Sequence, residues 1–306
     1  MRITFKSIMS HIKRIPGKTY TPIFVIGAPR SGTNLLRDLL CANPQCLTWP
    51  CDEINGVWRY GNLNLKDDEF DKSAANSVVK SFIRKNFAKF WRKKAQAQHC
   101  YLVEKTCANS LRLEFVKEIF PDAKFIILFR NAPEVLHSAE KRWKGYFEYN
   151  LTEYLLRKVK YTPSKVLFVL TLNFLKIRIA RLFSSQRALS IWGPTICEFD
   201  SNIPRIDKIA LQWCKCVERT LDSLHDIPKE NYMIVHYDEV IRQPHDIVAS
   251  MLAFLGDELL DEANLSRIKI LNKSQHSSLP TGLSVETINK VKCCQKRIDE
   301  IFFQSP

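Results

Sequence analysis

Short apolar runs alternate along this chain with longer amphipathic stretches. The apolar runs have strand length and lie at 23–26, 47–49, 101–103, 124–129 and 232–235. Runs this short and this apolar are typical of strands buried on both faces of a sheet. The intervening stretches predict helices at 33–40, 69–94, 109–120, 206–225, 244–255 and 285–302, and another from Pro133. Strands that alternate with helices indicate an α/β fold, with a central parallel sheet flanked by helices.

One long stretch interrupts this alternation. Residues from about 145 to 205 contain an apolar, basic segment and a loop, and they predict an insertion or lid. The first 20 residues form a basic N-terminal segment, and the chain contains no internal repeat. A chain of 306 residues suffices for one large α/β domain, so residues 1–306 are expected to form a single domain.

The charge of the chain narrows the possible partners. The formal net charge is +14 and the isoelectric point is near 9.3, so anionic partners are expected: nucleic acid, an anionic membrane surface, a nucleotide or an acidic glycan. The N-terminal segment lacks the apolar core of a signal peptide, and the most apolar segment, 166–175, is too short to span a bilayer. A cytoplasmic location is therefore expected, with transient contact to an anionic membrane surface as a further possibility.

The ten cysteines do not follow the spacing of a zinc site. They are expected to be small apolar core residues in a reducing compartment, and no metal is expected. The cysteines lie at positions 41, 46, 51, 100, 107, 197, 214, 216, 293 and 294.

The first predicted strand, the loop Gly27-Ala28-Pro29-Arg30-Ser31-Gly32 and the helix from Thr33 form a unit that resembles a P-loop. A strand, a glycine loop and a helix N-terminus bring several backbone N–H groups around one point, which is a cradle for a phosphate-like anion. A P-loop has Lys-Ser or Lys-Thr after its second glycine, but this chain has Thr33-Asn34. The cation is Arg30, inside the loop.

Two other predicted strands end in chemically distinctive residues. The strand at 101–103 leads into Glu104-Lys105-Thr106, and the strand at 124–129 leads into Arg130, with Ser138 in the helix that follows. Ligands of such sheets bind at the carboxyl ends of the strands. The chain therefore predicts two anion-binding sites, which suits a nucleotide with both 5′ and 3′ phosphates.

Three segments together resemble the sulfotransferases that use 3′-phosphoadenosine 5′-phosphosulfate (PAPS). They are Pro29-Arg30-Ser31-Gly32-Thr33-Asn34, Phe129-Arg130-Asn131-Ala132-Pro133 with Ser138, and His236-Tyr237-Asp238-Glu239-Val240 with Pro244 and Phe254-Leu255-Gly256. The segments 104–112 and 58–62 look more like the prokaryotic and carbohydrate-type branches. The resemblance implies in-line transfer of the sulfuryl group from PAPS to a hydroxyl or amine, with a glycan or glycolipid as the expected acceptor. The residues that it assigns to donor binding are Arg30, Ser31, Gly32, Thr33, Asn34, Arg130 and Ser138.

The same resemblance suggests the catalytic residues. Arg30 and Lys105 are expected to neutralise charge on the transferred group. An alcohol acceptor needs a general base, and the histidine that follows Lys-Thr in the cytosolic branch is replaced here by Cys107. Glu53, on the loop after the first helix, is the preferred base, with Glu104 and Asp52 as alternatives.

Two other functions are compatible with part of the sequence. A P-loop nucleotide kinase would carry Lys-Ser/Thr after Gly32 and an aspartate at the end of the strand 124–129, and this chain has neither. A non-enzymatic basic protein that binds anions or nucleic acid would explain the charge but not the two strand-end motifs. No nucleic-acid-binding signature is present, so no nucleic-acid partner is expected.

Overall fold

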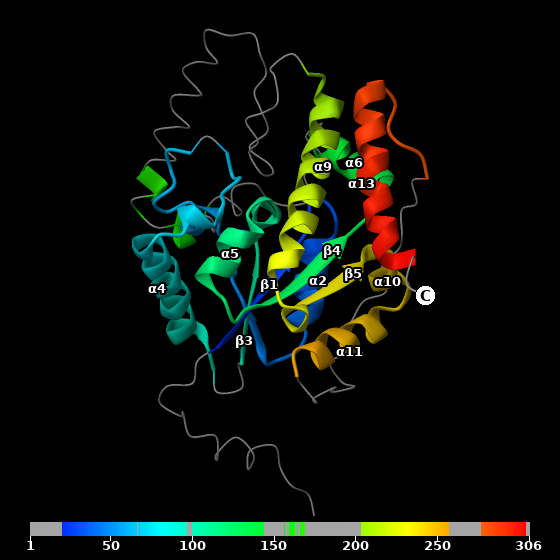
Figure 1. Cartoon of the computed structure of the whole chain (residues 1–306). Coiled ribbons are helices and arrows are strands. Elements are labelled where there is room, and N and C mark those ends of the chain that lie inside the picture. Colours follow the sequence, from blue (N-terminus) through cyan, green and yellow to red (C-terminus); the bar gives the residue numbers. More distant parts are fainter. Residues whose placement is uncertain are drawn as a thin grey trace, which may run out of the picture.

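A parallel sheet lies at the centre of the computed structural model (Figure 1). The structure describes residues 20–65, 67–96, 100–143, 156, 159–162, 164, 166–168, 203–256 and 277–303. The described strands are β1 (Thr21–Ile26), β2 (Cys46–Thr48), β3 (Tyr101–Lys105), β4 (Lys124–Phe129) and β5 (Tyr232–His236). They form one sheet in the order β2-β3-β1-β4-β5, and every neighbouring pair is parallel. The predicted α/β class and the parallel sheet are confirmed.

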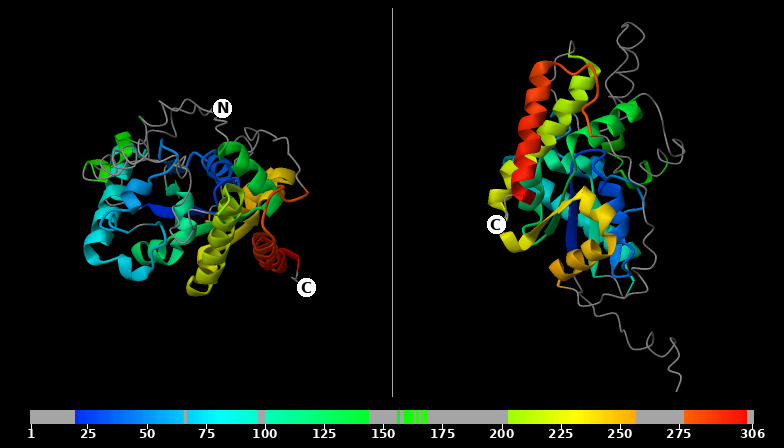
Figure 2. Two further views of the ribbon diagram at one scale, coloured as in Figure 1. Left: turned by 90° about the horizontal axis from the view of Figure 1, so that it is seen from above. Right: turned by 90° about the vertical axis from the view of Figure 1, so that its right-hand side faces the viewer.

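Helices cover both faces of the sheet. They are α2 (Thr33–Leu40), α3 (Asn55–Trp58), α4 (Ser77–Lys94), α5 (Leu113–Ile119), α6 (Ala132–Trp143), α9 (Arg205–Ser223), α10 (Tyr237–Arg242), α11 (Pro244–Phe254) and α13 (Val285–Phe303). Short 3-10 helices also occur: η1 (Lys72–Ala74), η2 (Cys107–Leu111), η3 (Leu224–Asp226) and η4 (Lys229–Asn231). Two further views separate the faces, with α9 and α13 on one side of the sheet and α2 on the other (Figure 2).

The alternation of side chains along the central strands explains why helices cover both faces of the sheet. In β1, Phe24 and Ile26 join the core beneath α4, α5 and α9, whereas Ile23 and Val25 join the core beneath α2 and α11. All four side chains are essentially inaccessible to solvent. Because successive side chains of a strand point to opposite faces, a continuous apolar run is what a strand covered on both faces requires.

The strand order places the chemically distinctive strand ends side by side. β1 pairs with β3 on one side and with β4 on the other, in register from Val25 to Lys105 and from Ile26 to Ile127. The chain therefore changes direction across the sheet at β1. Ligands of open α/β sheets bind beyond the carboxyl ends of the strands at such a point.

Two predicted helix boundaries are wrong, and local capping explains the first of them. The helix expected from residue 69 begins at Ser77, because Asp71 accepts a hydrogen bond from the Ser73 N–H and caps η1, and Asn76 then caps α4. The helix expected over 109–120 is divided into η2 and α5. Arg112 separates them with a non-helical backbone conformation and a fully buried side chain.

Some predictions fall outside the described residues. These include the basic segment 1–20, apart from Tyr20, and most of the insertion or lid at about 145–205. In the part of the chain that is described, no helix has the length and apolarity needed to cross a membrane. The nine described cysteines are free thiols, and among the described residues no cluster of His, Cys, Asp or Glu is arranged to hold a metal ion.

Candidate functional site

The loop between β1 and α2 has the backbone geometry of an anion cradle. Arg30 and Gly32 both adopt left-handed conformations, with φ of 69° and 100°. Left-handed residues in a tight turn curl successive N–H groups toward one point. The N-terminus of α2 has no side-chain cap. Its first helical hydrogen bond runs from the Leu36 N–H to the Gly32 carbonyl oxygen, so the N–H groups of Thr33, Asn34 and Leu35 have no acceptor within the helix. Partial positive charge at this helix end favours a bound anion.

Ser31 supports this loop from within. Its hydroxyl donates to the Ala28 carbonyl oxygen at 2.6 Å, and its backbone N–H donates to the same oxygen at 3.2 Å. The side chain is 1% exposed. In this geometry Ser31 holds the turn in shape, and a direct contact between Ser31 and the donor stays a prediction.

Gly32 is required by both its backbone and its surroundings. A Cβ atom at this position would lie 2.4 and 2.5 Å from two ring carbons of Tyr237, and the φ of 100° is strained for any other residue. Gly32→Ala is therefore expected to destabilise the fold by about 1–3 kcal/mol and to weaken anion binding at the cradle. Chemical denaturation measures the first effect and calorimetric titration the second. An alanine variant with unchanged stability and binding would contradict this role of Gly32.

The two predicted anion sites are contiguous. The Arg30 Nε donates to the Ser138 hydroxyl at 3.1 Å, and an Arg130 terminal nitrogen donates to the Arg30 carbonyl oxygen at 3.1 Å. Arg130 is mostly buried and also donates to Glu134 at 2.8 Å. Residues about 100 positions apart in the sequence thus form one cationic site at the ends of β1 and β4.

Tyr237 joins these two sites, a role that the sequence pattern alone does not indicate. The Arg130 guanidinium lies 3.9 Å from the centre of the Tyr237 ring, and the same ring packs against Gly32. A cation over an aromatic face is stabilised by the ring electrons. Tyr237 therefore helps to fix Arg130 relative to the cradle.

Helix α13 contacts the two residues that follow Arg130. The Gln295 side chain accepts a hydrogen bond from the Ala132 N–H at 2.9 Å and donates to Asn131 at 3.0 Å. This contact satisfies a first-turn amide of α6, the helix that carries Ser138. Nothing in the sequence pattern pointed to Gln295, because the contact depends on how α13 packs.

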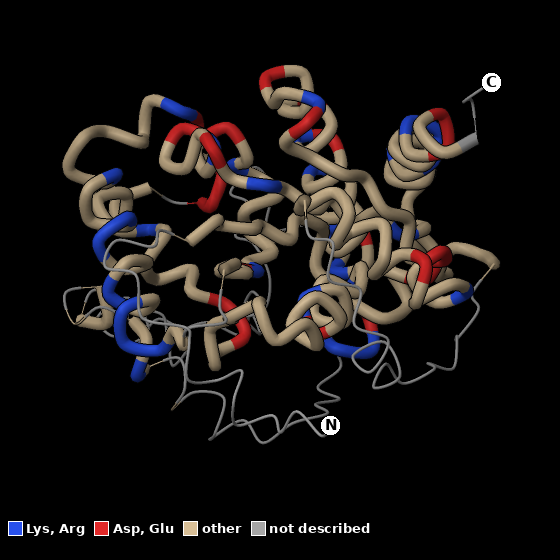
Figure 3. The backbone as a smooth tube through the Cα atoms, turned by 90° about the horizontal axis from the view of Figure 1, so that it is seen from below, with Lys and Arg blue, Asp and Glu red and all other residues tan. Residues whose placement is uncertain are grey.

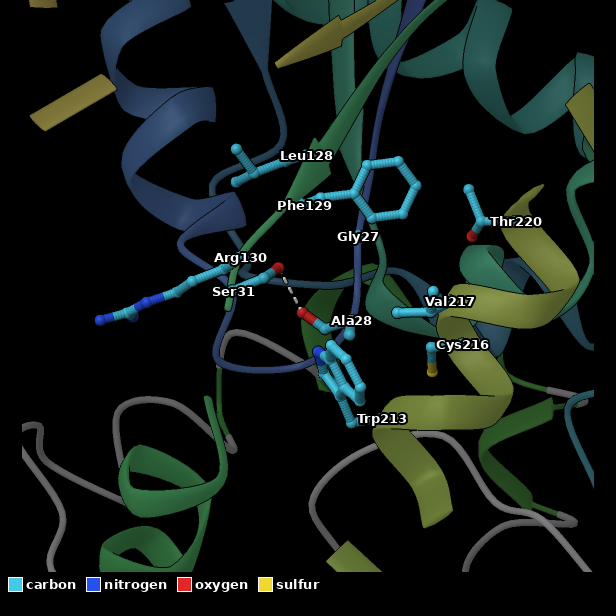
Figure 4. A pocket seen from close by; sticks show the side chains of 10 residues that line it. All are labelled: Gly27, Ala28, Ser31, Leu128, Phe129, Arg130, Trp213, Cys216, Val217 and Thr220. Carbon is cyan, nitrogen blue, oxygen red and sulfur yellow. Dashed lines mark hydrogen bonds between the residues drawn. The ribbon is translucent and has the colours of Figure 1, made fainter. Parts of the chain in front are cut away.

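A small pocket lies between the loop and α9 (Figure 4). Its walls include Gly27 and Ala28 of the loop, the end of β4, and Trp213, Cys216, Val217 and Thr220 of α9. Arg130 also lines it, but its side chain extends away from the α9 wall. The walls are mainly apolar, and the hydroxyls of Ser31 and Thr220 already donate to carbonyl oxygens. The groups expected to bind phosphate therefore lie on the cationic side of the loop, where the Arg130 side chain extends.

Lys105 forms the second part of the site, together with the loop before α3. Its ammonium lies 2.8 Å from an Asp52 carboxylate oxygen and 3.3 Å from Glu53. The Lys105 side chain is 2% exposed. Burial by itself would lower the pKa of Lys105, but the carboxylates of Glu53 and Asp52 raise it above its usual value. Lys105 is therefore a cation at neutral pH.

Glu53 connects this lysine to the anion cradle. It accepts a hydrogen bond from the Cys107 N–H at 3.1 Å, and the Cys107 sulfur lies 3.6 Å from the Thr33 hydroxyl of the cradle. Burial raises the pKa of the Cys107 thiol well above its usual range, so the thiol stays protonated. Cys107 is thus unsuited to the role of a base, and Glu53 is a carboxylate close to both Lys105 and the cradle.

The two alternative bases, Asp52 and Glu104, have surroundings that differ from those of Glu53. Asp52 is shared between Lys105 and Arg37, which lies 3.2 Å away. Glu104 is 1% exposed and accepts hydrogen bonds from Thr106 and Asn109. Burial raises the pKa of Glu104 to about 7. Its enclosure leaves it no direct access to an acceptor.

The raised pKa of Glu104 predicts how stability depends on pH. Between about pH 5 and pH 7 the unfolded chain has lost this proton while the folded chain retains it, so the free energy of unfolding falls as the pH rises. The slope contributed by one such group is at most about 1.4 kcal/mol per pH unit. Denaturation of the wild type and Glu104→Gln across this range measures the contribution. Identical pH dependence in the two proteins would contradict it.

Known proteins resemble this chain both in sequence and in fold. A model of the sulfotransferase family matches residues 22–162, which include the anion cradle, Lys105, Arg130 and Ser138. The sulfotransferase domain from the curacin biosynthetic pathway is structurally similar, with a TM-score of 0.50 and 16% identity over 90% of this chain and 98% of that chain. At this identity the similarity concerns the fold.

Two curated relatives are named protein-tyrosine sulfotransferases. A putative one from Caenorhabditis briggsae is 30% identical over 167 residues, which are 48% of this chain and 53% of that protein. One from Drosophila melanogaster is 23% identical over 285 residues, 88% of this chain and 43% of that protein. The chain spans about half the length of these relatives. The resemblance to sulfotransferases is confirmed for residues 22–162, and the carbohydrate-type branch stays a prediction.

Proposed function

We propose that this protein is a sulfotransferase that moves the sulfuryl group of PAPS to a hydroxyl or amine of an acceptor. The observation that carries this proposal is the single cationic site formed by Arg30, Ser138 and Arg130 beside an uncapped helix N-terminus. Two adjacent anion sites match a nucleotide with phosphate at both the 5′ and 3′ positions. The cradle binds the 5′ side, and Arg130 with Ser138 binds the 3′-phosphate.

The side chains of the site supply the chemistry of an in-line displacement. Arg30, Lys105 and the first amides of α2 neutralise the oxygens around sulfur, which is the main way a protein catalyses this class of transfer. Glu53 accepts the proton of the acceptor hydroxyl. The bond between sulfur and the bridging phosphate oxygen breaks as the acceptor oxygen bonds to sulfur. The products are the sulfated acceptor and 3′,5′-bisphosphoadenosine (PAP).

Two acceptor classes are supported by different observations. The motifs around Lys105 favour a carbohydrate or glycolipid hydroxyl, whereas the relatives are named for protein tyrosine, which favours the phenolic hydroxyl of a peptide. Both acceptors present an oxygen nucleophile to the same base. The residues of the donor site do not distinguish the two.

The basic face of α4 supports contact with an anionic surface. This helix carries Lys and Arg but no acidic residue, and Figure 3 shows these charges along one edge of the molecule. They are Lys80, Arg84, Lys85, Lys89, Arg92, Lys93 and Lys94. Transient contact with an anionic membrane surface and a cytoplasmic location both remain predictions.

Transfer of labelled sulfate from PAPS tests the proposed function. The purified chain is incubated with PAPS and a panel of glycans, glycolipids and tyrosine peptides, and labelled products are separated. We expect transfer to at least one class and release of PAP in equal amount. Phosphoryl transfer from ATP with Mg²⁺, without any sulfuryl transfer, would favour the nucleotide kinase instead.

A further inference from the structure

The residues that follow Glu53 are held by a closed ring of hydrogen bonds. The Ile54 N–H donates to the Thr106 hydroxyl at 3.2 Å, and that hydroxyl donates to Glu104. The other Glu104 oxygen accepts from the Asn109 side-chain amide at 3.0 Å. These contacts lead from the loop before α3, which carries Asp52 and Glu53 and is called the carboxylate loop below, into the end of β3 and then into η2.

The ring then returns to the carboxylate loop through a buried arginine. Arg112 Nε donates to the Asn109 side-chain oxygen at 2.9 Å, and an Arg112 terminal nitrogen donates to the Asn55 side-chain oxygen at 2.6 Å. Asn55 is the neighbour of Ile54. The ring therefore begins and ends on two consecutive residues, immediately after Glu53.

A second set of contacts braces Arg112. Asp68 lies 3.3 Å from Arg112 and 2.9 Å from Arg59, and it also accepts from the Asn55 amide at 3.2 Å. Both arginines lie over the Phe70 ring, at 5.0 and 5.6 Å from its centre. Three members of the hydrogen-bond ring, Thr106, Asn109 and Arg112, are fully buried. Breaking any one contact leaves a buried polar group unpaired, which costs more than the bond itself contributes.

We propose that this ring is a positioning device for Glu53, in which Thr106 and Asn55 hold the two residues after Glu53 and thereby fix its carboxylate between Lys105 and the Cys107 N–H. Glu53 is on a loop, and a loop carboxylate needs a rigid support to stay aligned. Thr106 and Asn55 are positioning residues, since Thr106 is fully buried and the Asn55 side chain is bonded to Arg112 and Asp68. The expected catalytic effect rests on the proposed function, but the structural effect does not.

The test uses variants on both sides of Ile54. Thr106→Val removes the hydroxyl with little change of shape, Thr106→Ser restores it, and Asn55→Ala removes the other anchor at a half-buried position. Thr287→Val is the matched control, because Thr287 is a buried threonine at the start of α13. Three quantities are measured on the full chain: turnover of labelled sulfate, affinity for PAP, and the rate of amide hydrogen exchange at Cys107.

We expect Thr106→Val and Asn55→Ala to lower kcat by about 10–100-fold, because a misplacement of about 1 Å costs that much. PAP affinity should stay within about twofold. The Cys107 amide should exchange at least about tenfold faster, since it donates to Glu53. Thr106→Ser and Thr287→Val should behave as the wild type.

The outcomes separate this proposal from the proposed function. Unchanged kcat and unchanged amide exchange at Cys107 in both Thr106→Val and Asn55→Ala would contradict the proposal that the ring positions Glu53. Equal losses of kcat and PAP affinity would contradict it as well. If the wild type transfers no sulfate, the proposed function fails, and exchange at Cys107 still decides whether the ring holds Glu53. If Thr106→Val does not fold, the same three measurements on Asn55→Ala test the proposal.

Discussion

Glu53→Gln is expected to lower kcat for sulfuryl transfer by about 10²–10⁴-fold, the usual contribution of a general base. The substitution keeps the size of the side chain and one acceptor for the Cys107 N–H, but it removes the carboxylate that is proposed to take the acceptor proton. Affinity for PAP should stay within about twofold, because the proposed donor site lies at Arg30 and Arg130. Steady-state kinetics with labelled PAPS and calorimetric titration with PAP measure the two quantities.

Asp52→Asn is the matched control for this variant. Asp52 contacts the same Lys105 ammonium, so its substitution removes one negative charge from the same cluster without removing the proposed base. We expect a much smaller loss of kcat. A larger loss in Asp52→Asn than in Glu53→Gln would transfer the role of base to Asp52, and full activity of Glu53→Gln would exclude Glu53.

Arg130→Ala is expected to weaken PAP binding by about 10–150-fold. A hydrogen bond to a charged group contributes about 1.5–3 kcal/mol, and Arg130 is the proposed partner of the 3′-phosphate. Adenosine 5′-monophosphate lacks that phosphate, so its affinity should change little. Calorimetric titration of both nucleotides into wild type and variant gives the coupling between Arg130 and the 3′-phosphate.

Lys141→Ala controls for the loss of one positive charge. Lys141 is an exposed residue at the C-terminal end of α6, the helix that follows Arg130. Its removal should leave the affinity for both nucleotides unchanged. If Arg130→Ala weakens PAP and adenosine 5′-monophosphate by the same factor, Arg130 supports the loop as a whole and does not recognise the 3′-phosphate.

Much of the fold and the placement of the candidate site could be predicted from the strands and their ends. The apolar runs that became β1, β3 and β4 ended in Gly27, Glu104-Lys105 and Arg130, and a parallel sheet necessarily brings such ends to one edge. The contact between Arg30 and Ser138 follows from this arrangement. The order of the strands in the sheet thus decides which residues lie together in the candidate site, and no single motif predicts this.

The supports of the site could not be predicted in the same way. Gln295 reaches Asn131 from a helix more than 160 positions away, and Arg112, between η2 and α5, reaches Asn55. Such contacts depend on how helices pack, and a hydrophobic pattern carries no information about which polar side chain meets which. The late start of α4 has a local cause, since Asp71 and Asn76 compete with a continuous helix for the same backbone amides.

Calorimetric titration of the wild type with PAP and, separately, with ATP and Mg²⁺ tests most directly whether the paired cationic sites bind a sulfate donor. We expect PAP to bind at a single site with higher affinity than adenosine 5′-monophosphate, because only PAP fills both the cradle and the site at Arg130 and Ser138. Binding of ATP with Mg²⁺ together with no measurable binding of PAP would contradict the proposed donor and the function built on it.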